Sequence, residues 1–177
     1  MYKTLKKIIP FIFFQKINNE DLIILLPKNL RFSLLCLKKH INYQFSLLSY
    51  IAGVDLLGCK YRFCVVYDLL SLSFNIRLRI KLFITEVNTI PSVTDIYVNS
   101  NWWEREVWDL FGIYFENHPD LRRILTDYGF EGYPMRKDFP LYGYTELRYD
   151  ESKKQIVVES VELSQNFRLF EFEMPWQ

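Results

Sequence analysis

Cysteine, glycine and alanine are all scarce in this chain of 177 residues. Its three cysteines, Cys36, Cys59 and Cys64, form no Cys-x-x-Cys pair and share no metal-type spacing with the two histidines, which argues against a disulfide framework or a zinc site. A cubane iron–sulfur cluster is normally held by four thiolates, so this chain cannot supply a standard set alone. We therefore expect reduced thiols that lie mainly in the core.

Six glycines leave little material for phosphate-binding loops, and the sequence contains no Gly-x-Gly-x-x-Gly turn, Walker loop or Gly-x-Ser-x-Gly elbow. Long hydrophobic runs are missing as well, because the 50% hydrophobic residues are interspersed with 24% charged ones and the mean hydropathy is -0.04. No direct membrane span is therefore expected. The single alanine, Ala52, among many Phe, Tyr, Ile, Asn and Lys residues indicates a biased, organelle-like genome.

The 22 basic and 21 acidic side chains leave a net charge of +1, which gives no reason to expect a nucleic-acid partner. The charge is uneven along the chain. Residues 1–40 contain eight basic and two acidic side chains, whereas residues 150–177 contain three and six. The two ends could attract each other or different partners.

The N-terminus superficially imitates a secretory signal, with three early lysines followed by apolar residues 8–14. Pro10 interrupts that stretch, and Gln15 and Lys16 offer no small-residue cleavage site. We expect an N-terminal helix packed on the domain.

The first half of the chain predicts strands and one helix. Residues 22–26 form a short apolar run closed by Pro27, as in a strand buried on both faces. Asn29 is the expected N-cap of a following helix. Its apolar face is predicted from Leu30, Leu34, Leu37 and Ile41.

Three further strands are predicted at residues 45–54, 62–72 and 76–82, with a turn at residues 73–75. The last alternates most clearly, with Arg77, Arg79 and Lys81 on one face and Ile76, Leu78, Ile80 and Leu82 on the other. The basic face is either a solvated sheet surface or a docking surface for an acidic partner.

A turn or short helix is expected at Pro91 and Ser92, followed by a helix whose capping box joins Asn101 to Glu104. Gly112 is expected to end that helix. Within it, Arg105 and Asp109 are four residues apart and can pair. A further short helix is predicted to open at Pro119 and to run through Arg122 to Leu125.

From Gly129 onward, glycine and proline are interleaved with aromatic residues and neither helical nor strand periodicity fits. Disordered segments are usually poor in aromatics, so an extended arm lying against a surface is expected. We predict an α/β fold of the α+β type, with a mixed sheet and helices in a compact domain at residues 1–128 and a partner-binding arm at residues 129–177. Strand-like pieces are expected at residues 155–163 and 167–172.

His118 is the obvious catalytic candidate, with several carboxylates nearby in the sequence. A general base needs an orienting group and a substrate within hydrogen-bond reach. A histidine directly before a helix-opening proline is equally suited to capping, and we favour this structural use over a small hydrolase.

Four segments in the second half of the chain carry a family signature. They are Glu104-Arg105-Glu106-Val107-Trp108-Asp109-Leu110-Phe111-Gly112-Ile113, His118-Pro119-Asp120-Leu121-Arg122-Arg123-Ile124-Leu125, Gly129-Phe130-Glu131-Gly132 and Arg136-Lys137-Asp138-Phe139-Pro140. Together with Arg148-Tyr149-Asp150 and the Pro175-Trp176 ending, they resemble the 30-kDa subunit family of respiratory NADH dehydrogenase, complex I, called subunit 9 when mitochondrially encoded. Tyr133 and Met135 depart from the residues expected there, without affecting the match.

The resemblance implies a domain in the peripheral arm near the quinone-reducing module, on the matrix side of the mitochondrial inner membrane. It implies a C-terminal extension wrapped over the 49-kDa subunit and contacts with other peripheral-arm subunits. No cofactor is expected on this chain; neighbouring subunits would carry FMN and iron–sulfur clusters and bind quinone. A related plastid or hydrogenase-type complex is the alternative.

We expect a scaffold subunit with no catalytic centre of its own. Its expected structural or interface anchors are Glu104, Arg105, Glu106, Asp109, His118, Asp120, Arg122, Arg123, Arg136, Lys137 and Asp138.

Overall fold

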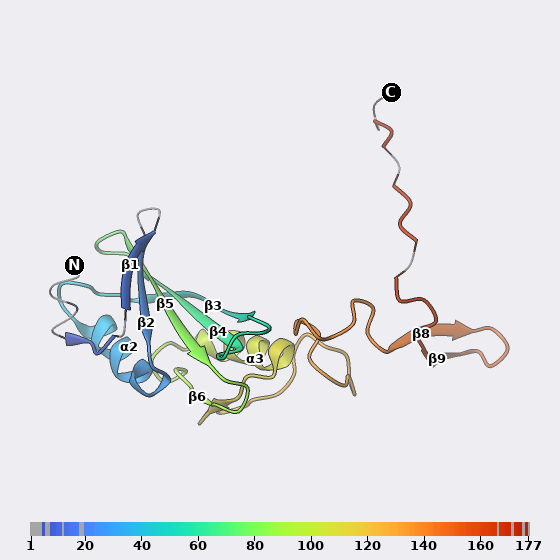
Figure 1. Ribbon diagram of the computed structural model, residues 1–177, viewed down its shortest axis with the longest axis horizontal. Coiled ribbons are helices and arrows are strands. Elements are labelled where there is room, and N and C mark those ends of the chain that lie inside the picture. Colours follow the sequence, from blue (N-terminus) through green and yellow to red (C-terminus); the bar gives the residue numbers. More distant parts are fainter. Residues whose placement is uncertain are drawn as a thin grey trace. The chain divides into compact units, whose positions relative to one another are not determined.

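The computed structural model describes residues 5, 8–11, 13–17, 20–165, 167–170, 172–174 and 176 (Figure 1). The chain forms two compact units, Met1–Arg136 and Lys137–Gln177. The described part of the first contains a mixed sheet and the α-helices α2 and α3, and that of the second a β-hairpin. The predicted α+β class is confirmed.

A five-stranded sheet organises the first unit, in the order β1-β2-β5-β4-β3. Strands β2 and β5 run parallel, and all other neighbours in this sheet are antiparallel. The strands are β1 (Phe13–Ile17), β2 (Glu20–Leu25), β3 (Leu47–Asp55), β4 (Phe63–Ser71) and β5 (Ile76–Ile84).

Strand β1 was not predicted. It pairs with β2 in an antiparallel register that places Phe14 opposite Ile23. Much of the expected N-terminal helix lies outside the described residues, although the backbone N–H of Ile9 donates to the Leu5 carbonyl at 2.8 Å.

The predicted alternation of β5 is confirmed, because Leu78, Ile80 and Leu82 are fully buried. They share one core with apolar residues of both helices, α2 (Leu30–Lys39) and α3 (Ser100–Phe111). On the opposite face the basic row meets acidic partners: Arg79 pairs with Asp68 at 3.3 Å and with Glu20 at 3.0 Å. The solvated-face interpretation therefore accounts for Arg79 without a docking partner.

Helix α2 follows a single 3₁₀ turn, Pro27–Asn29. Asn29 occupies the N-cap position as expected, but its side chain makes no capping hydrogen bond and instead donates to the Pro10 carbonyl at 3.5 Å. Leu30, Leu34 and Leu37 are buried as predicted, whereas Ile41 lies beyond the helix end and is exposed.

A short parallel pair, β6 (Ile90–Pro91) and β7 (Phe115–Glu116), brackets α3. The segment after Pro91 is a turn, with Tyr97 N–H bonded to the Val93 carbonyl at 2.9 Å. Gly112 adopts a φ of 74° and ends α3 as predicted, because a left-handed residue breaks the helical hydrogen-bond ladder.

The second unit contains the hairpin of β8 (Thr145–Asp150) and β9 (Gln155–Ser160). Strand β9 confirms the first expected strand-like piece, although it ends at Ser160. The second piece was wrong, since the described residues between 167 and 172 form no regular structure. Among all described residues, no helix is long and apolar enough to cross a membrane.

Candidate functional site

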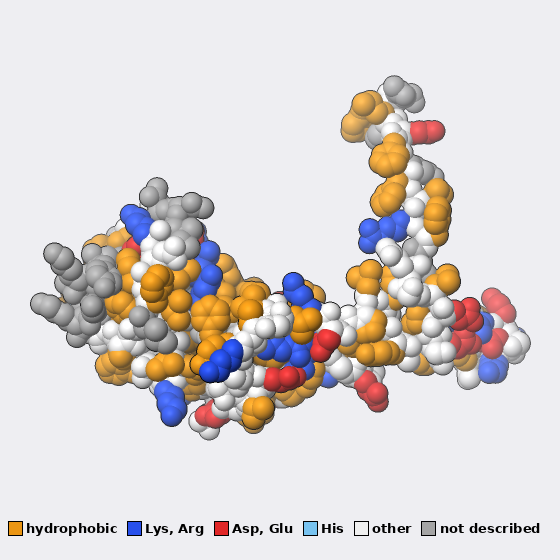
Figure 2. Space-filling model, viewed as in Figure 1, with side chains coloured by type: hydrophobic (Ala, Val, Ile, Leu, Met, Phe, Trp, Pro, Cys, Tyr) orange, Lys and Arg blue, Asp and Glu red, His pale blue; other side chains and the backbone are white. Residues whose placement is uncertain are grey.

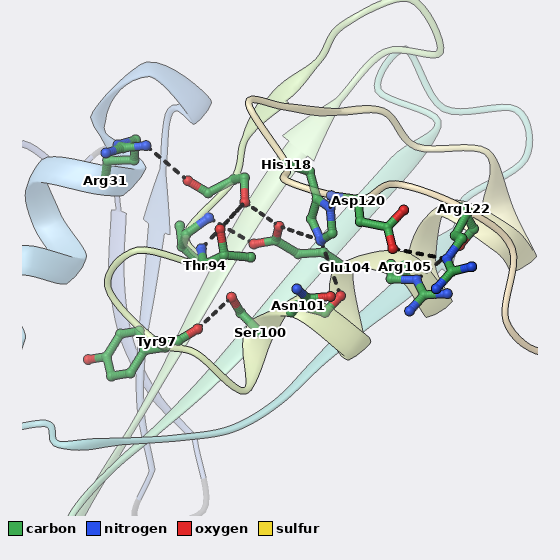
Figure 3. A network of polar contacts seen from close by, with 12 residues as sticks. Arg31, Thr94, Tyr97, Ser100, Asn101, Glu104, Arg105, His118, Asp120 and Arg122 are labelled. Carbon is green, nitrogen blue, oxygen red and sulfur yellow. Dashed lines mark hydrogen bonds and ion pairs between the residues drawn. The ribbon is translucent and has the colours of Figure 1, made fainter.

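Helix α3 carries four of the expected anchors. Glu104, Arg105 and Asp109 are buried and Glu106 is half-buried. The three buried ones reach away from the helix into loops elsewhere in the sequence, as Figure 3 shows for Glu104 and Arg105. α3 is therefore the support on which the loops at residues 92–97 and 118–126 are held.

Glu104 holds the turn after β6. Its Oε2 accepts from the Ser92 hydroxyl at 2.6 Å and its Oε1 accepts from the Val93 backbone N–H at 2.8 Å. The predicted capping box with Asn101 was wrong, because the N-cap of α3 is Asn99, two residues earlier, and the Glu104 carboxylate is already engaged. Burial raises the pKa of Glu104 to about 7, and the hydrogen bonds from Ser92 and Val93 only partly oppose that rise.

His118 lies beside Glu104, with its Nε2 3.8 Å from the carboxylate, and both side chains are enclosed. Its Nδ1 accepts the Asp120 backbone N–H at 3.1 Å, so the ring proton sits on Nε2, which is 3.2 Å from the Asn101 carbonyl. Burial lowers the pKa of His118, and the charge of Arg105 lowers it further. With both nitrogens occupied by backbone groups, the ring is placed as a structural link, which gives the hydrolase alternative no support.

Asp109 organises the loop that follows. Its Oδ2 accepts the backbone N–H groups of Ile124, Leu125 and Thr126 at 3.1, 2.8 and 2.9 Å. Burial alone would raise the pKa of Asp109, but these bonds and the Thr126 hydroxyl outweigh it and lower the pKa. Arg123 Nη1 completes the cluster at 3.2 Å from Oδ1.

Two expectations fail here for the same reason. The Arg105–Asp109 ion pair was wrong, because Asp109 binds Arg123 while Arg105 Nε donates to the Arg122 carbonyl at 3.2 Å. The short helix after Pro119 was also wrong. Backbone N–H groups at the end of this segment donate to the Asp109 carboxylate, which belongs to α3. They are therefore not available for the hydrogen bonds of a helix.

Arg136 anchors the last residues of the first unit. Its Nε donates to the Phe111 carbonyl at 2.7 Å, and its Nη1 lies 2.5 Å from Glu86. The guanidinium also lies over the Tyr133 ring, at 4.7 Å from the centroid. Tyr133 in turn covers Gly112, where an added Cβ would lie 2.6 Å from the ring.

The remaining anchors lie at the surface. Asp120 and Arg122 are exposed and pair with each other at 2.9 Å. Lys137 and Asp138 are exposed at the start of the second unit. Ser92, Thr126 and Tyr133 also contact these anchors, although they were not among the expected anchor residues. Folding brings them close to their partners.

The hairpin of the second unit has two unlike faces. Register pairs Leu147 with Val158 and Tyr149 with Ile156, so these four apolar side chains share one face. All four are exposed. The other face is mostly polar: it includes the Arg148–Glu159 ion pair at 2.6 Å, with Val157 as its apolar residue.

The segment after the hairpin is also apolar and exposed. Figure 2 shows hydrophobic side chains along this C-terminal stretch. The exposed large ones in the described part are Leu163, Phe167, Leu169, Phe170, Phe172, Met174 and Trp176. Soluble monomers seldom display large contiguous apolar surfaces.

A family comparison identifies the first unit and the start of the second. Residues 23–145 match the family described as respiratory-chain NADH dehydrogenase, 30 Kd subunit. This chain belongs to that family. The sequence-based assignment is therefore confirmed, and the match includes α3 with its bound loops.

Named relatives are highly similar. The chain is 56% identical to NADH-ubiquinone oxidoreductase subunit 9 of Reclinomonas americana, over 85% of this chain and 74% of that protein. The subunit 9 of Prototheca wickerhamii is 52% identical, over 90% and 83%. NADH dehydrogenase [ubiquinone] iron-sulfur protein 3 of Beta trigyna is 55% identical, over 82% and 77%.

A solved structure shares the fold. A chain of the membrane-bound sulfane sulfur reductase, an archaeal respiratory membrane complex, superposes with a TM-score of 0.66 at 26% identity. The superposition covers 88% of this chain and 96% of that one. The family fold is thus present in respiratory membrane complexes that differ in substrate.

The relatives' name raises the question of an iron–sulfur cluster on this chain. Cys36 lies in α2, Cys59 in the loop after β3 and Cys64 in β4. Three thiols are one fewer than a cubane cluster takes. No group of three or more His, Cys, Asp or Glu residues in the described chain has metal-binding geometry, so these residues do not fit a cluster.

Proposed function

We propose that this chain is a non-redox core subunit of the peripheral arm of the proton-pumping NADH:ubiquinone oxidoreductase. In that role it supports assembly and positions the quinone-reducing module, on the matrix side of the mitochondrial inner membrane. Family membership and relatives at 52–56% identity support the choice of complex. The enzyme's FMN, iron–sulfur clusters and quinone site would belong to neighbouring subunits.

The observation that carries the scaffold role is the apolar face of the hairpin. An isolated two-stranded hairpin is marginally stable in water. Leu147, Tyr149, Ile156 and Val158 together have no apolar cover within their own unit, since each remains more than half exposed. A neighbouring subunit would bury them, and we assign this role to the 49-kDa subunit.

The division of the chain supports the same role. Met1–Arg136 has its own sheet, helices and core, whereas Lys137–Gln177 has strands but no buried cluster among its described residues. The first unit is thus built to fold by itself, and the second to gain its order from a partner. Burying the hairpin face would contribute about 25 cal/mol for each Å² of apolar surface removed from water.

Two variants test the proposal. Val158→Asn weakens the apolar face, and Glu159→Gln changes the polar face of the same strand. We expect Val158→Asn to reduce incorporation of the full chain into the complex, measured by native electrophoresis of solubilised organelle membranes, while Glu159→Gln incorporates normally. A chain ending at Arg136 should unfold cooperatively yet fail to incorporate.

Normal assembly of the chain ending at Arg136 would contradict the proposal. So would a stoichiometric flavin or iron–sulfur absorption band in the purified chain. A related complex is the alternative, and the archaeal sulfane sulfur reductase shares the fold, but the identity there is 26% against more than 50% for the NADH-ubiquinone proteins.

A further inference from the structure

Arg105 has an unusual environment for a buried arginine. The residue is only 8% exposed, and its single hydrogen bond runs from Nε to the Arg122 carbonyl. No carboxylate of the described residues lies within ion-pair distance of it. Its Nη1 and Nη2 have no protein partner there, and neither is sealed from solvent.

Burying an arginine charge without a carboxylate is costly, so such groups are normally paired. Two acidic residues of this region are engaged elsewhere: Asp109 binds Arg123 and the backbone of the following loop, and Asp120 pairs with Arg122. The positive charge of Arg105 is felt at His118, whose pKa it helps to lower. The site therefore retains an uncompensated positive charge.

The surroundings of Arg105 have the composition of a protein-binding surface. The guanidinium lies 5.6 Å from the ring centroid of Trp102, which is 67% exposed. Arg122 is its immediate neighbour and has a side chain that is 71% exposed (Figure 3). Tryptophan and arginine are the residues most enriched at the energetic centres of protein interfaces.

We propose that Trp102, Arg105 and Arg122 form a second docking point, which receives an acidic side chain of another subunit of the same complex. A carboxylate lying between the two guanidinium groups would complete the pairing of Arg105, and Trp102 would be covered by the partner's surface. A protein carboxylate fits better than a phosphate, because the Asp120 carboxylate within the cluster repels a dianion. This inference rests on the proposed function.

The test uses the full chain in its complex. Tagged Trp102→Ala and Arg122→Ala are each expressed beside the untagged wild-type chain, and the ratio of tagged to untagged chain is measured in the isolated complex. We expect each substitution to lower this ratio about tenfold, as the loss of one interface centre does. Tyr61→Ala and Lys60→Ala are matched controls, because that exposed cation–aromatic pair lies in the β3–β4 loop, and both should keep the wild-type ratio.

A photo-crosslinking residue, p-benzoylphenylalanine, in place of Trp102 then identifies the contact in the assembled complex. We expect a cross-linked peptide that contains Asp or Glu, and incorporation lost in Arg122→Glu should return when that acid is changed to arginine. This reciprocal rescue also decides the matter if a single variant proves less stable.

Wild-type ratios for both tagged variants would overturn the inference. So would a cross-link to lipid, or failure of the reciprocal charge change to restore incorporation. Failure of the proposed function has a different signature: Val158→Asn would then incorporate normally. If only the second docking point is wrong, Val158→Asn still blocks incorporation while the Trp102 and Arg122 variants do not.

Discussion

Asp109 and Thr126 are joined by two hydrogen bonds across seventeen residues of sequence. The Thr126 hydroxyl donates to Oδ1 at 2.6 Å, and its backbone N–H donates to Oδ2 at 2.9 Å. Through this pairing a single helical carboxylate shapes the loop that ends at Thr126. The stability of the loop should therefore depend on the charge of that one side chain.

Asp109→Asn should lower the free energy of unfolding by roughly 3 kcal/mol, because an amide nitrogen would face donors that now bind a buried carboxylate. Chemical denaturation of the full chain measures this loss. Asp127→Asn is the matched control, since Asp127 is exposed and accepts one local N–H, and it should cost less than about 1 kcal/mol. Equal losses in the two variants would contradict the role given to Asp109.

Gly112→Ala should destabilise the chain in two ways. Its φ of 74° disfavours any Cβ, and that Cβ would lie 2.6 Å from the Tyr133 ring. Gly129→Ala separates the two effects, because Gly129 has a φ of 71° and nothing near its missing Cβ. We expect about 1 kcal/mol for Gly129→Ala and a clearly larger loss for Gly112→Ala, both from thermal unfolding. The same loss at both positions would show that the Tyr133 contact relaxes freely.

Arg136→Lys should weaken the attachment of residues 133–136 to the first unit. A lysine cannot keep both the Nε bond to the Phe111 carbonyl and planar stacking on Tyr133. We expect a loss of about 1–2 kcal/mol in the free energy of unfolding. Arg148→Lys, at an exposed ion pair, is the control and should change it little. Hydrogen exchange at the Met135 amide, which bonds to the Leu110 carbonyl, should rise in Arg136→Lys alone.

The Glu104 and His118 pair should give opposing pH effects on stability. The pKa of Glu104 in the folded chain is raised from 4.5 to about 7. Its contribution to the free energy of unfolding is therefore fully present below pH 4.5 and is lost as the pH rises through 7. That contribution is on the order of 3 kcal/mol. The pKa of His118 is lowered from 6.5, so its contribution is present above that pH and is lost on acidification.

Single variants separate these two contributions. In Glu104→Gln the free energy of unfolding should no longer fall between pH 5 and 7, leaving the loss on acidification that His118 causes. In His118→Gln the fall with rising pH should remain and become steeper. Denaturation curves at several pH values measure both, and unchanged pH dependence in Glu104→Gln would refute the assignment.

Strands β2, β3, β4, β5 and β9 could be predicted from the sequence to within a few residues because alternation and apolar runs are local signals. β5 shows this best, with its basic and apolar faces already distinct. The end of α3 at Gly112 was also local, since glycine alone tolerates that backbone geometry without strain. Strand β1 escaped prediction because its first residues belong to the apolar stretch 8–14, which follows three lysines and was assigned to an N-terminal helix.

The polar partners of α3 could not be predicted. Helical spacing places Arg105 beside Asp109, and local rules favour that pair. Folding offered Asp109 three backbone N–H groups and a hydroxyl, which stabilise a buried carboxylate better than one flexible side chain does. Likewise, the sequence spacing predicts that Glu104 caps the start of α3. In the fold, its carboxylate instead accepts hydrogen bonds from Ser92 and Val93, in the loop after β6.

The sequence by itself determined the family and the fold class, because these depend on residue order and on patterns that repeat over a few positions. Tertiary structure alone decided which carboxylate meets which arginine and which loop. Those choices depend on distances between segments far apart in the chain, and burial strengthens whichever contact folding makes possible. Arg105 is the clearest case, since helical spacing places it beside Asp109 whereas in the fold its hydrogen bond goes to the Arg122 carbonyl.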